Sequence, residues 1–248
     1  MEIVAGWFRE LYEATGINLT IVYDPFDRLR FAEGLLISLE LMVLCIGCSI
    51  LIGVVGAWLQ RSRLKGPRFA VECYIQLFRN TPPLIQLYFL YFAIGPHFSV
   101  QSASGTAVPL VSNFTWAAIC FSIYAGAFNV EIFRAGIEAI PRTTIEAANV
   151  LGLRRIQVYR LILLPLAFRI SLPALNNNLV NLIKTTTIAY AIAVPELLYV
   201  SNQIWSDAIN VAVMMNVLML TYISVVGLFI LVMNRIEHAL RIPGMGDT

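Results

Sequence analysis

The chain has 248 residues, of which 58% are hydrophobic and 13% are charged, and its mean hydropathy is +0.75. A soluble globular domain carries about 25% charged residues, so this composition excludes an ordinary soluble protein and indicates an integral membrane protein. The formal net charge of +2 is small, and no basic patch indicates a nucleic-acid-binding protein.

The first 32 residues mix charged and apolar side chains, without the basic start and apolar core of a cleavable signal peptide. Trp7, Phe8, Leu11 and Tyr12 fall at helical spacing. The segment is therefore expected to be either an amphipathic helix at the membrane interface or a disordered leader.

Five later segments are apolar and long enough to cross the hydrocarbon core, which takes about 20 residues per helix. They are 35–59, 69–94, 114–133, 172–193 and 211–233. Because backbone polar groups cannot stay unpaired in lipid, we expect helices rather than an open sheet. The predicted fold class is an all-α membrane protein with five transmembrane helices.

Basic residues indicate how these helices are oriented. The loops 95–113 and 197–210 contain no Lys or Arg, whereas the segments after the first, third and fifth spans are basic. Short basic loops stay in the cytoplasm, so the N-terminus is predicted outside and the C-terminus in the cytoplasm. Three parts are expected: an extracytoplasmic or interfacial segment 1–32, a transmembrane domain 33–235 and a cytoplasmic tail 236–248.

The second predicted span contains an arginine, an asparagine and two prolines within 79–83. Proline removes a backbone donor and disfavours helix in the residue before it, so Pro82 and Pro83 should kink or interrupt the helix. One interpretation is a helix that begins just inside the membrane. The other is irregular backbone that lines a cavity, in which case Gln86 belongs to a solute path.

Polar residues also occur in the third and fourth spans. Glu131 and Arg134 stand i, i+3 apart and are interpreted as an ion pair at the surface or at a gate. Asn177, Asn181 and Lys184 stand at i, i+4 and i+7, hence on one helical face, which Asn176, Asn178 and 185–187 widen.

Such polar groups are costly in lipid and should face protein or water. Two interpretations remain for the fourth span: hydrogen bonds that hold a dimer together, and a lining of the translocation path. The candidate path residues are Gln86, Asn177, Asn181, Lys184 and Thr185.

A polar segment, 140–165, separates the third and fourth spans. Glu146, Ala147 and Ala148 should open a short helix that Gly152 ends. Small residues followed by a glycine suit close insertion into a groove of a partner. The segment is therefore a candidate contact through which another protein drives this one.

The sequence contains little that indicates a metal-binding or catalytic site. Cys45 and Cys48 form a CxxC pair inside an apolar helix without a second pair, so we expect no metal site. Neither a zinc-protease motif nor a phosphate-binding GxxxxGK[ST] loop occurs in the sequence, so we assign no catalytic residue and no cofactor to this chain. Energy for any transport must come from a partner or an ion gradient.

Motifs along most of the chain resemble those of one family. They are 78–86, 124–137, 140–165, 172–176, 184–186 and 194–197. Together they resemble the membrane subunits of bacterial ATP-binding-cassette importers, in the subfamily that takes up polar amino acids of the histidine, glutamine and arginine type. The segment 140–165 resembles the EAA loop of that family, which docks into the ATPase subunit.

The resemblance implies a type I importer transmembrane fold, a bacterial inner-membrane location and an alternating-access mechanism. It also implies a second permease subunit, two cytoplasmic ATPases that hold ATP and Mg²⁺, and an extracytoplasmic solute-binding protein. The implied coupling loop spans about 136–162. Its expected contact residues are Arg142, Glu146, Ala147, Ala148, Leu151, Gly152 and Arg154.

Some positions depart from the family pattern. Pro83 replaces the usual Leu, 143–144 replaces Gly-Gln, and Thr185 replaces the acid that normally follows Lys184. These differences leave open an amino-acid derivative, such as an opine, as the solute. A self-contained secondary transporter or channel is the alternative, but it would need inverted repeats or a carboxylate relay, and the predicted helices contain few acids besides Glu40 and Glu131.

Overall fold

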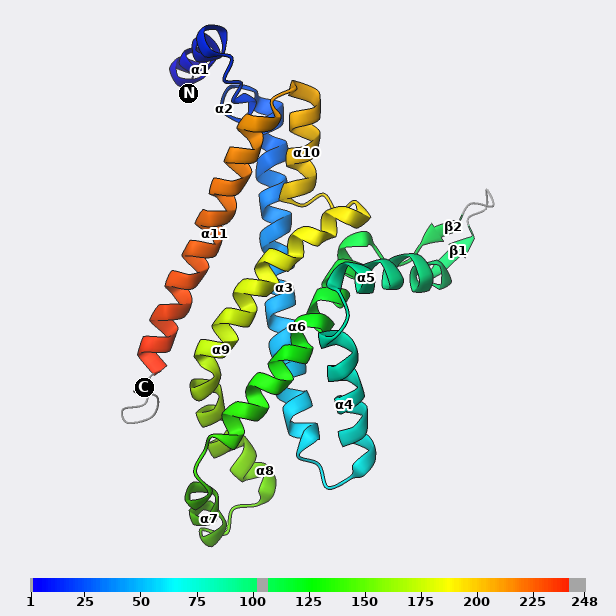
Figure 1. Ribbon diagram of the computed structural model, residues 1–248, viewed down its shortest axis with the longest axis vertical. Coiled ribbons are helices and arrows are strands. Elements are labelled where there is room, and N and C mark those ends of the chain that lie inside the picture. Colours follow the sequence, from blue (N-terminus) through cyan, green and yellow to red (C-terminus); the bar gives the residue numbers. More distant parts are fainter. Residues whose placement is uncertain (1, 102–106, 241–248) are drawn as a thin grey trace. The chain divides into compact units, whose positions relative to one another are not determined.

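The computed structural model describes residues 2–101 and 107–240, and Figure 1 shows their helices. The chain divides into two compact units. The first unit comprises Met1–Leu44, Leu84–Cys120 and Ile183–Leu228. The second unit comprises Cys45–Pro83, Phe121–Leu182 and Phe229–Thr248.

Nearly all described elements are helical. In chain order they are α1 (Glu2–Thr15), α2 (Thr20–Tyr23), α3 (Pro25–Gln60), α4 (Lys65–Arg79), α5 (Pro83–Tyr88), the π-helix η1 (Phe89–Ile94), the 3-10 helix η2 (Gly95–His97), β1 (Ser99–Gln101), β2 (Ala107–Pro109), α6 (Asn113–Glu138), α7 (Arg142–Val150), α8 (Arg155–Val158), the π-helix η3 (Tyr159–Leu163), α9 (Leu164–Thr185), the 3-10 helix η4 (Thr186–Ile192), α10 (Leu197–Ala208) and α11 (Val211–Leu240).

Four helices of the described residues are long and apolar enough to cross a membrane: Pro25–Gln60, Asn113–Glu138, Arg155–Ile192 and Val211–Leu240. They contain the first, third and fifth predicted spans and nearly all of the fourth. Each is longer than its apolar core, because polar helical turns continue it at one or both ends. The predicted helix at the N-terminus is also present as α1, and residues 25–32 already belong to α3.

The second predicted span is wrong as one continuous helix. α4 ends at Arg79 and α5 begins at Pro83, so the expected interruption at the prolines is confirmed. Side chains complete the end of α4: Asn80 Nδ2 donates to the Gln76 carbonyl at 2.8 Å, and Thr81 Oγ1 donates to the Leu77 carbonyl at 2.8 Å. The polar groups freed by the break are thus partly satisfied locally.

Two segments predicted as loops contain regular structure. Residues 197–210 contain α10, and residues 95–113 contain an antiparallel hairpin in which Val100 is paired with Val108. Glu196 caps α10, because its carboxylate accepts hydrogen bonds from the backbone N–H groups of Leu198 at 3.0 Å and Tyr199 at 2.9 Å. An acidic residue at the N-cap position indicates the start of a helix, and this signal for α10 was missed in the sequence.

In the first unit, the same carboxylate joins three helices. Glu196 is 1% exposed, and it accepts hydrogen bonds from Ser38 on α3 at 3.4 Å and from Tyr222 on α11 at 3.1 Å. Burial raises the pKa of the Glu196 carboxyl, and the bonds from the α10 backbone partly oppose that rise. α10 is also packed against α11 through a cluster of Val200, Ile204 and Met214.

In the second unit, glycines bring α3, α6 and α9 into close contact. A Cβ atom on Gly53 would lie 2.5 Å from Asn129, and one on Gly56 would lie 2.3 Å from Val130. At Gly136 it would lie 2.1 Å from Ser171 Oγ and 2.8 Å from the Ala167 carbonyl oxygen. Small residues at helix contacts are characteristic of membrane proteins, because lipid does not drive apolar helices together.

We predict that Gly136→Ala lowers the thermal unfolding temperature of the purified protein. The added methyl group would meet the backbone oxygen of Ala167, which cannot rotate away as a side chain can. Overpacking of this kind costs about 1–3 kcal/mol, or a few degrees per kcal/mol for a chain of this size. Gly47→Ala is the matched control, since its Cβ meets no atom within 4 Å. Equal melting temperatures for the two variants would contradict the packing.

Candidate functional site

The polar residues of α9 divide between two faces. Asn177, Asn181 and Lys184 are exposed, which confirms that they share one helical face. Asn178 points inward instead, and its Nδ2 donates to Asn129 Oδ1 at 2.8 Å and to the Ala125 carbonyl at 3.2 Å. For the exposed face, both interpretations of the sequence, a dimer contact and a lining of the path, stay predictions. Asn178 joins helices within the chain, and the exposed face remains a candidate path.

The remaining path candidates are buried within the first unit. Thr185 ends α9 and is 8% exposed, and Gln86 lies on α5 and is 9% exposed. Because both side chains are buried, neither Gln86 nor Thr185 belongs to the exposed face that Asn177, Asn181 and Lys184 form. In contrast, Lys184 places an exposed ammonium group inside a helix that is apolar enough to span the membrane. A charge there requires water or a partner protein.

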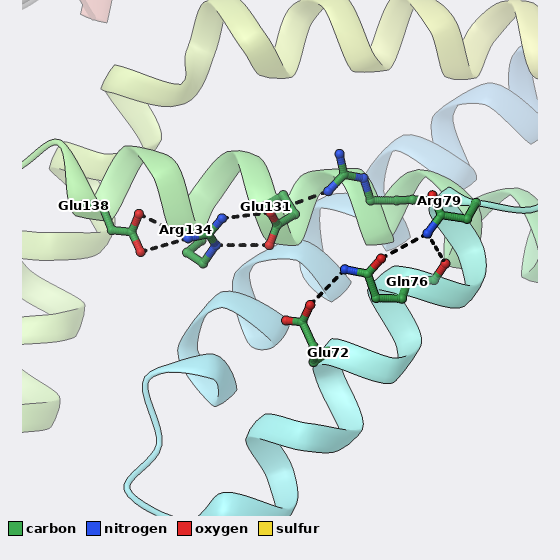
Figure 2. A network of polar contacts seen from close by, with 7 residues as sticks. Glu72, Gln76, Arg79, Glu131, Arg134 and Glu138 are labelled. Atoms are coloured by element: carbon green, nitrogen blue, oxygen red, sulfur yellow. Dashed lines mark hydrogen bonds and ion pairs between the residues drawn. The ribbon is translucent and has the colours of Figure 1, made fainter.

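A row of charged residues connects α4 and α6 in the second unit (Figure 2). The Arg134 guanidinium donates to both oxygens of Glu131, at 3.0 and 2.8 Å, and its Nη1 also contacts Glu138 at 3.0 Å. Arg79 approaches the same Glu131 carboxylate from α4, at 3.5 Å, and lies 5.2 Å from the centre of the Phe128 ring.

The predicted ion pair between Glu131 and Arg134 is thus confirmed as part of a larger network. Sequence reasoning missed Glu138, although its i+4 spacing from Arg134 could have indicated it. It also missed the contact of Arg79 with Glu131, for which local spacing gave no signal. Because Glu131 lies between two guanidinium groups, it ties α4 to α6.

The segment predicted to contact a partner contains the short helix α7. α7 begins at Arg142, after Pro141, rather than at Glu146 as predicted. Its end is as predicted: Gly152 has φ +75°, the Gly152 N–H bonds to the Asn149 carbonyl at 3.0 Å, and the Leu153 N–H bonds to the Ala148 carbonyl at 3.3 Å. This pair of bonds is a Schellman motif, which favours glycine at the left-handed position.

Most of the expected contact residues are exposed, namely Arg142, Glu146, Ala147, Leu151, Gly152 and Arg154. Ala148 is the exception: it is 2% exposed and seats the helix against the rest of the chain. Val150 is 87% exposed and Leu151 is 78% exposed. Val150, which is not among the expected contact residues, adds an apolar side chain to the tip of this segment.

Two hydrogen bonds attach this segment to α3 and to the residue that follows it, within the second unit. The Arg155 side chain donates to the Arg61 carbonyl, and Tyr159 Oη donates to the Val54 carbonyl at 3.1 Å. Gln157 Oε1 accepts a hydrogen bond from the Arg154 N–H at 2.8 Å and so starts α8. The part of the segment that follows α7 is thus attached to the C-terminal half of α3 and to the residue after it.

Comparison with known proteins places the chain among transport components. A family profile described as "binding-protein-dependent transport system inner membrane component" matches residues 46–241. A putative glutamine transport system permease protein of Rickettsia bellii is 35% identical over 164 residues, which cover 64% of this chain and 69% of that protein. The L-cystine transport system permease protein of Bacillus subtilis is 30% identical over 190 residues, which cover 77% and 76% of the two chains.

Solved structures have a similar fold. An amino acid ABC transporter crystallised with histidines matches with a TM-score of 0.72 and 25% identity, over 86% of this chain and 94% of that one. An inward-facing methionine ABC transporter matches with a TM-score of 0.69 and 19% identity, over 88% and 99% of the two chains. The second similarity is one of fold.

We predict that neighbouring asparagines of α9 differ sharply in their effect on stability. Asn178→Leu removes an interhelical bond and leaves Asn129, which is 0% exposed, without that partner. A buried polar group left unsatisfied costs about 1–3 kcal/mol. Asn177→Leu, one residue away on the exposed face, should change the unfolding free energy by less than about 0.5 kcal/mol. Unfolding of the purified protein should separate them, and similar losses would refute the two-face assignment.

Proposed function

The chain belongs to the family of binding-protein-dependent transport system inner membrane components, and on this premise we propose that it passes a polar amino acid or an amino-acid derivative across the membrane. It is a transmembrane permease subunit of an ABC importer. The substrate class is supported by relatives named for glutamine, cystine, octopine and glutamate or aspartate transport.

The observation that carries the coupling proposal is the exposed, Schellman-ended α7 with an apolar tip. We propose that Arg142, Glu146, Ala147, Leu151, Gly152 and Arg154 contact an ATPase subunit, with Ala148 seating the helix from behind. ATP and Mg²⁺ would be held by that ATPase. For ATP to drive transport, it has to favour the outward-open state of the complex over the inward-open state.

The proposed assembly contains two permease subunits, two ATPases and an extracytoplasmic binding protein in the inner membrane of a bacterium. The basic loops support a cytoplasmic position for α7 and an outer position for the N-terminus. The proposed functional division is a segment 1–32 outside, a transmembrane domain 33–235 with its coupling loop at about 136–162, and a cytoplasmic tail 236–248. Residues 241–248 of that tail lie outside the described residues.

We assign the solute path to the exposed α9 face. Asn177 and Asn181 offer amide donors and acceptors, and Lys184 offers a positive charge in a spanning helix. A point charge in a narrow cavity is poorly screened, so Lys184 would attract a solute carboxylate. Gln86 and Thr185 remain proposed members of the path, and they would act from their buried positions.

We predict that Gly152→Ala and Glu146→Arg uncouple the importer while the protein still inserts. The alanine is strained at φ +75°, and the arginine reverses a charge on the exposed side of α7. Solute uptake should fall at least tenfold, together with co-purification of the ATPase. Gly66→Ala is the control, because its Cβ meets no atom within 4 Å and its φ is ordinary. Normal uptake by both α7 variants would disprove the coupling assignment.

We also predict that Lys184→Met raises the apparent KM of uptake selectively for solutes that carry a free carboxylate. The loss of one charge-assisted contact corresponds to about a tenfold increase or more. Uptake kinetics should be measured beside the yield of dimer cross-linking. Unchanged kinetics with intact dimers would show that the path lies elsewhere.

A further inference from the structure

A cavity of about 700 Å³ opens in the second unit, between the end of α3, α4 and α6. Its size is that of a typical ligand pocket. Two polar rows lie along its helical walls. Arg68, Glu72 and Gln76 recur every four residues on α4, and Glu131, Arg134 and Glu138 stand at i, i+3 and i+7 on α6. The ion pair between Arg79, at the end of α4, and Glu131 joins α4 to the row on α6 (Figure 2).

The positive side of this cavity is unneutralised. Arg61, Lys65 and Arg68 line it, and within the described part of the chain none of them forms an ion pair. In contrast, Arg134 is neutralised by Glu131 and Glu138. The turn between α3 and α4 therefore presents three cations that can receive a carboxylate.

The acidic residues of this cavity can accept further hydrogen bonds. Glu138 uses both oxygens for one nitrogen of Arg134, at 3.0 and 3.2 Å, and Glu72 receives one amide hydrogen from Gln76 at 2.9 Å. An ionised carboxylate has about four lone-pair sites, so both can accept more hydrogen bonds. Gln60 also lines this cavity, and its side chain bonds to Glu131, but its buried Oε1 has no hydrogen-bond partner among the described residues. Burying an acceptor without a hydrogen bond costs free energy, so a ligand that donates a hydrogen bond to it would be stabilised.

We propose that this cavity binds a free amino acid as a zwitterion, on the side of the membrane where α7 lies. Arg61, Lys65 and Arg68 hold its α-carboxylate. The Glu72 carboxylate, one helical turn from Arg68 on α4, receives its α-ammonium group, and Gln60 Oε1 and Glu138 provide further acceptors in the same cavity. The inference rests on the proposed function and extends it: imported solute leaves through this site, and accumulated solute binds back to it and slows import.

Charge decides between this ligand and a phosphate group of a lipid or of free phosphate. A phosphate would be attracted by the three cations, but Glu72 and Glu138 would repel it and Gln60 Oε1 would gain no ammonium donor. The coexistence of unpaired cations with carboxylates in one cavity therefore favours a zwitterion over a simple anion.

The binding test uses the purified permease–ATPase complex in nanodiscs, without the binding protein, and tritiated L-glutamine, L-cystine and L-glutamate. At least one should bind, and Arg68→Gln and Glu72→Gln should each raise its Kd at least tenfold. The matched control is Arg63→Gln, which removes a cation from the same turn but does not line this cavity, and which should leave Kd unchanged. N-acetylated and amidated forms of the bound amino acid should compete at least tenfold less well.

The transport test uses proteoliposomes that are preloaded with the same amino acid. Internal amino acid should slow wild-type import, and Arg68→Gln and Glu72→Gln should raise the half-inhibiting internal concentration at least fivefold, relative to each variant's rate into empty vesicles. Three results would overturn the inference: wild-type binding of none of the three amino acids, loss of binding in Lys184→Met but not in Arg68→Gln, or equal inhibition by internal phosphate. Absence of import with every solute would instead overturn the proposed function.

Discussion

Close helix contact at glycines is the constraint on which the second unit depends. At Gly53, Gly56 and Gly136 the neighbouring helix occupies the space that a side chain would need. Since lipid supplies no hydrophobic drive between apolar helices, such packing and the Asn129–Asn178 bond must hold α3, α6 and α9 together. The charged row on α6 and the attachment of α7 through Arg155 and Tyr159 both belong to this packed unit.

The sequence predicted those features that depend on local chemistry. Apolar length located the long helices, since crossing the hydrocarbon core requires it. The helix break at Pro82 and Pro83 followed from the missing backbone donors, and the end of α7 at Gly152 followed from the left-handed conformation that glycine tolerates. The common helical face of Asn177, Asn181 and Lys184 followed from helical periodicity.

Features that depend on tertiary contacts could not be predicted. Asn178 was expected to widen the face of Asn177, and only its packing against Asn129 shows that it turns inward. The contact between Arg79 and Glu131 joins residues far apart in the chain, so no local pattern reveals it. α10 went unrecognised because its flanks lack basic residues and the segment was interpreted as an outer loop, although Glu196 provides a cap.

The central claim is that a partner ATPase drives solute through this chain. The most direct measurement is the ATPase rate of the reconstituted complex, with the binding protein added empty or loaded from a panel of amino acids and their derivatives. The account predicts a rate that rises severalfold only with a loaded binding protein, together with uptake that requires ATP. Uptake that follows an ion gradient in the absence of ATP, with an ATPase rate indifferent to solute, would contradict it.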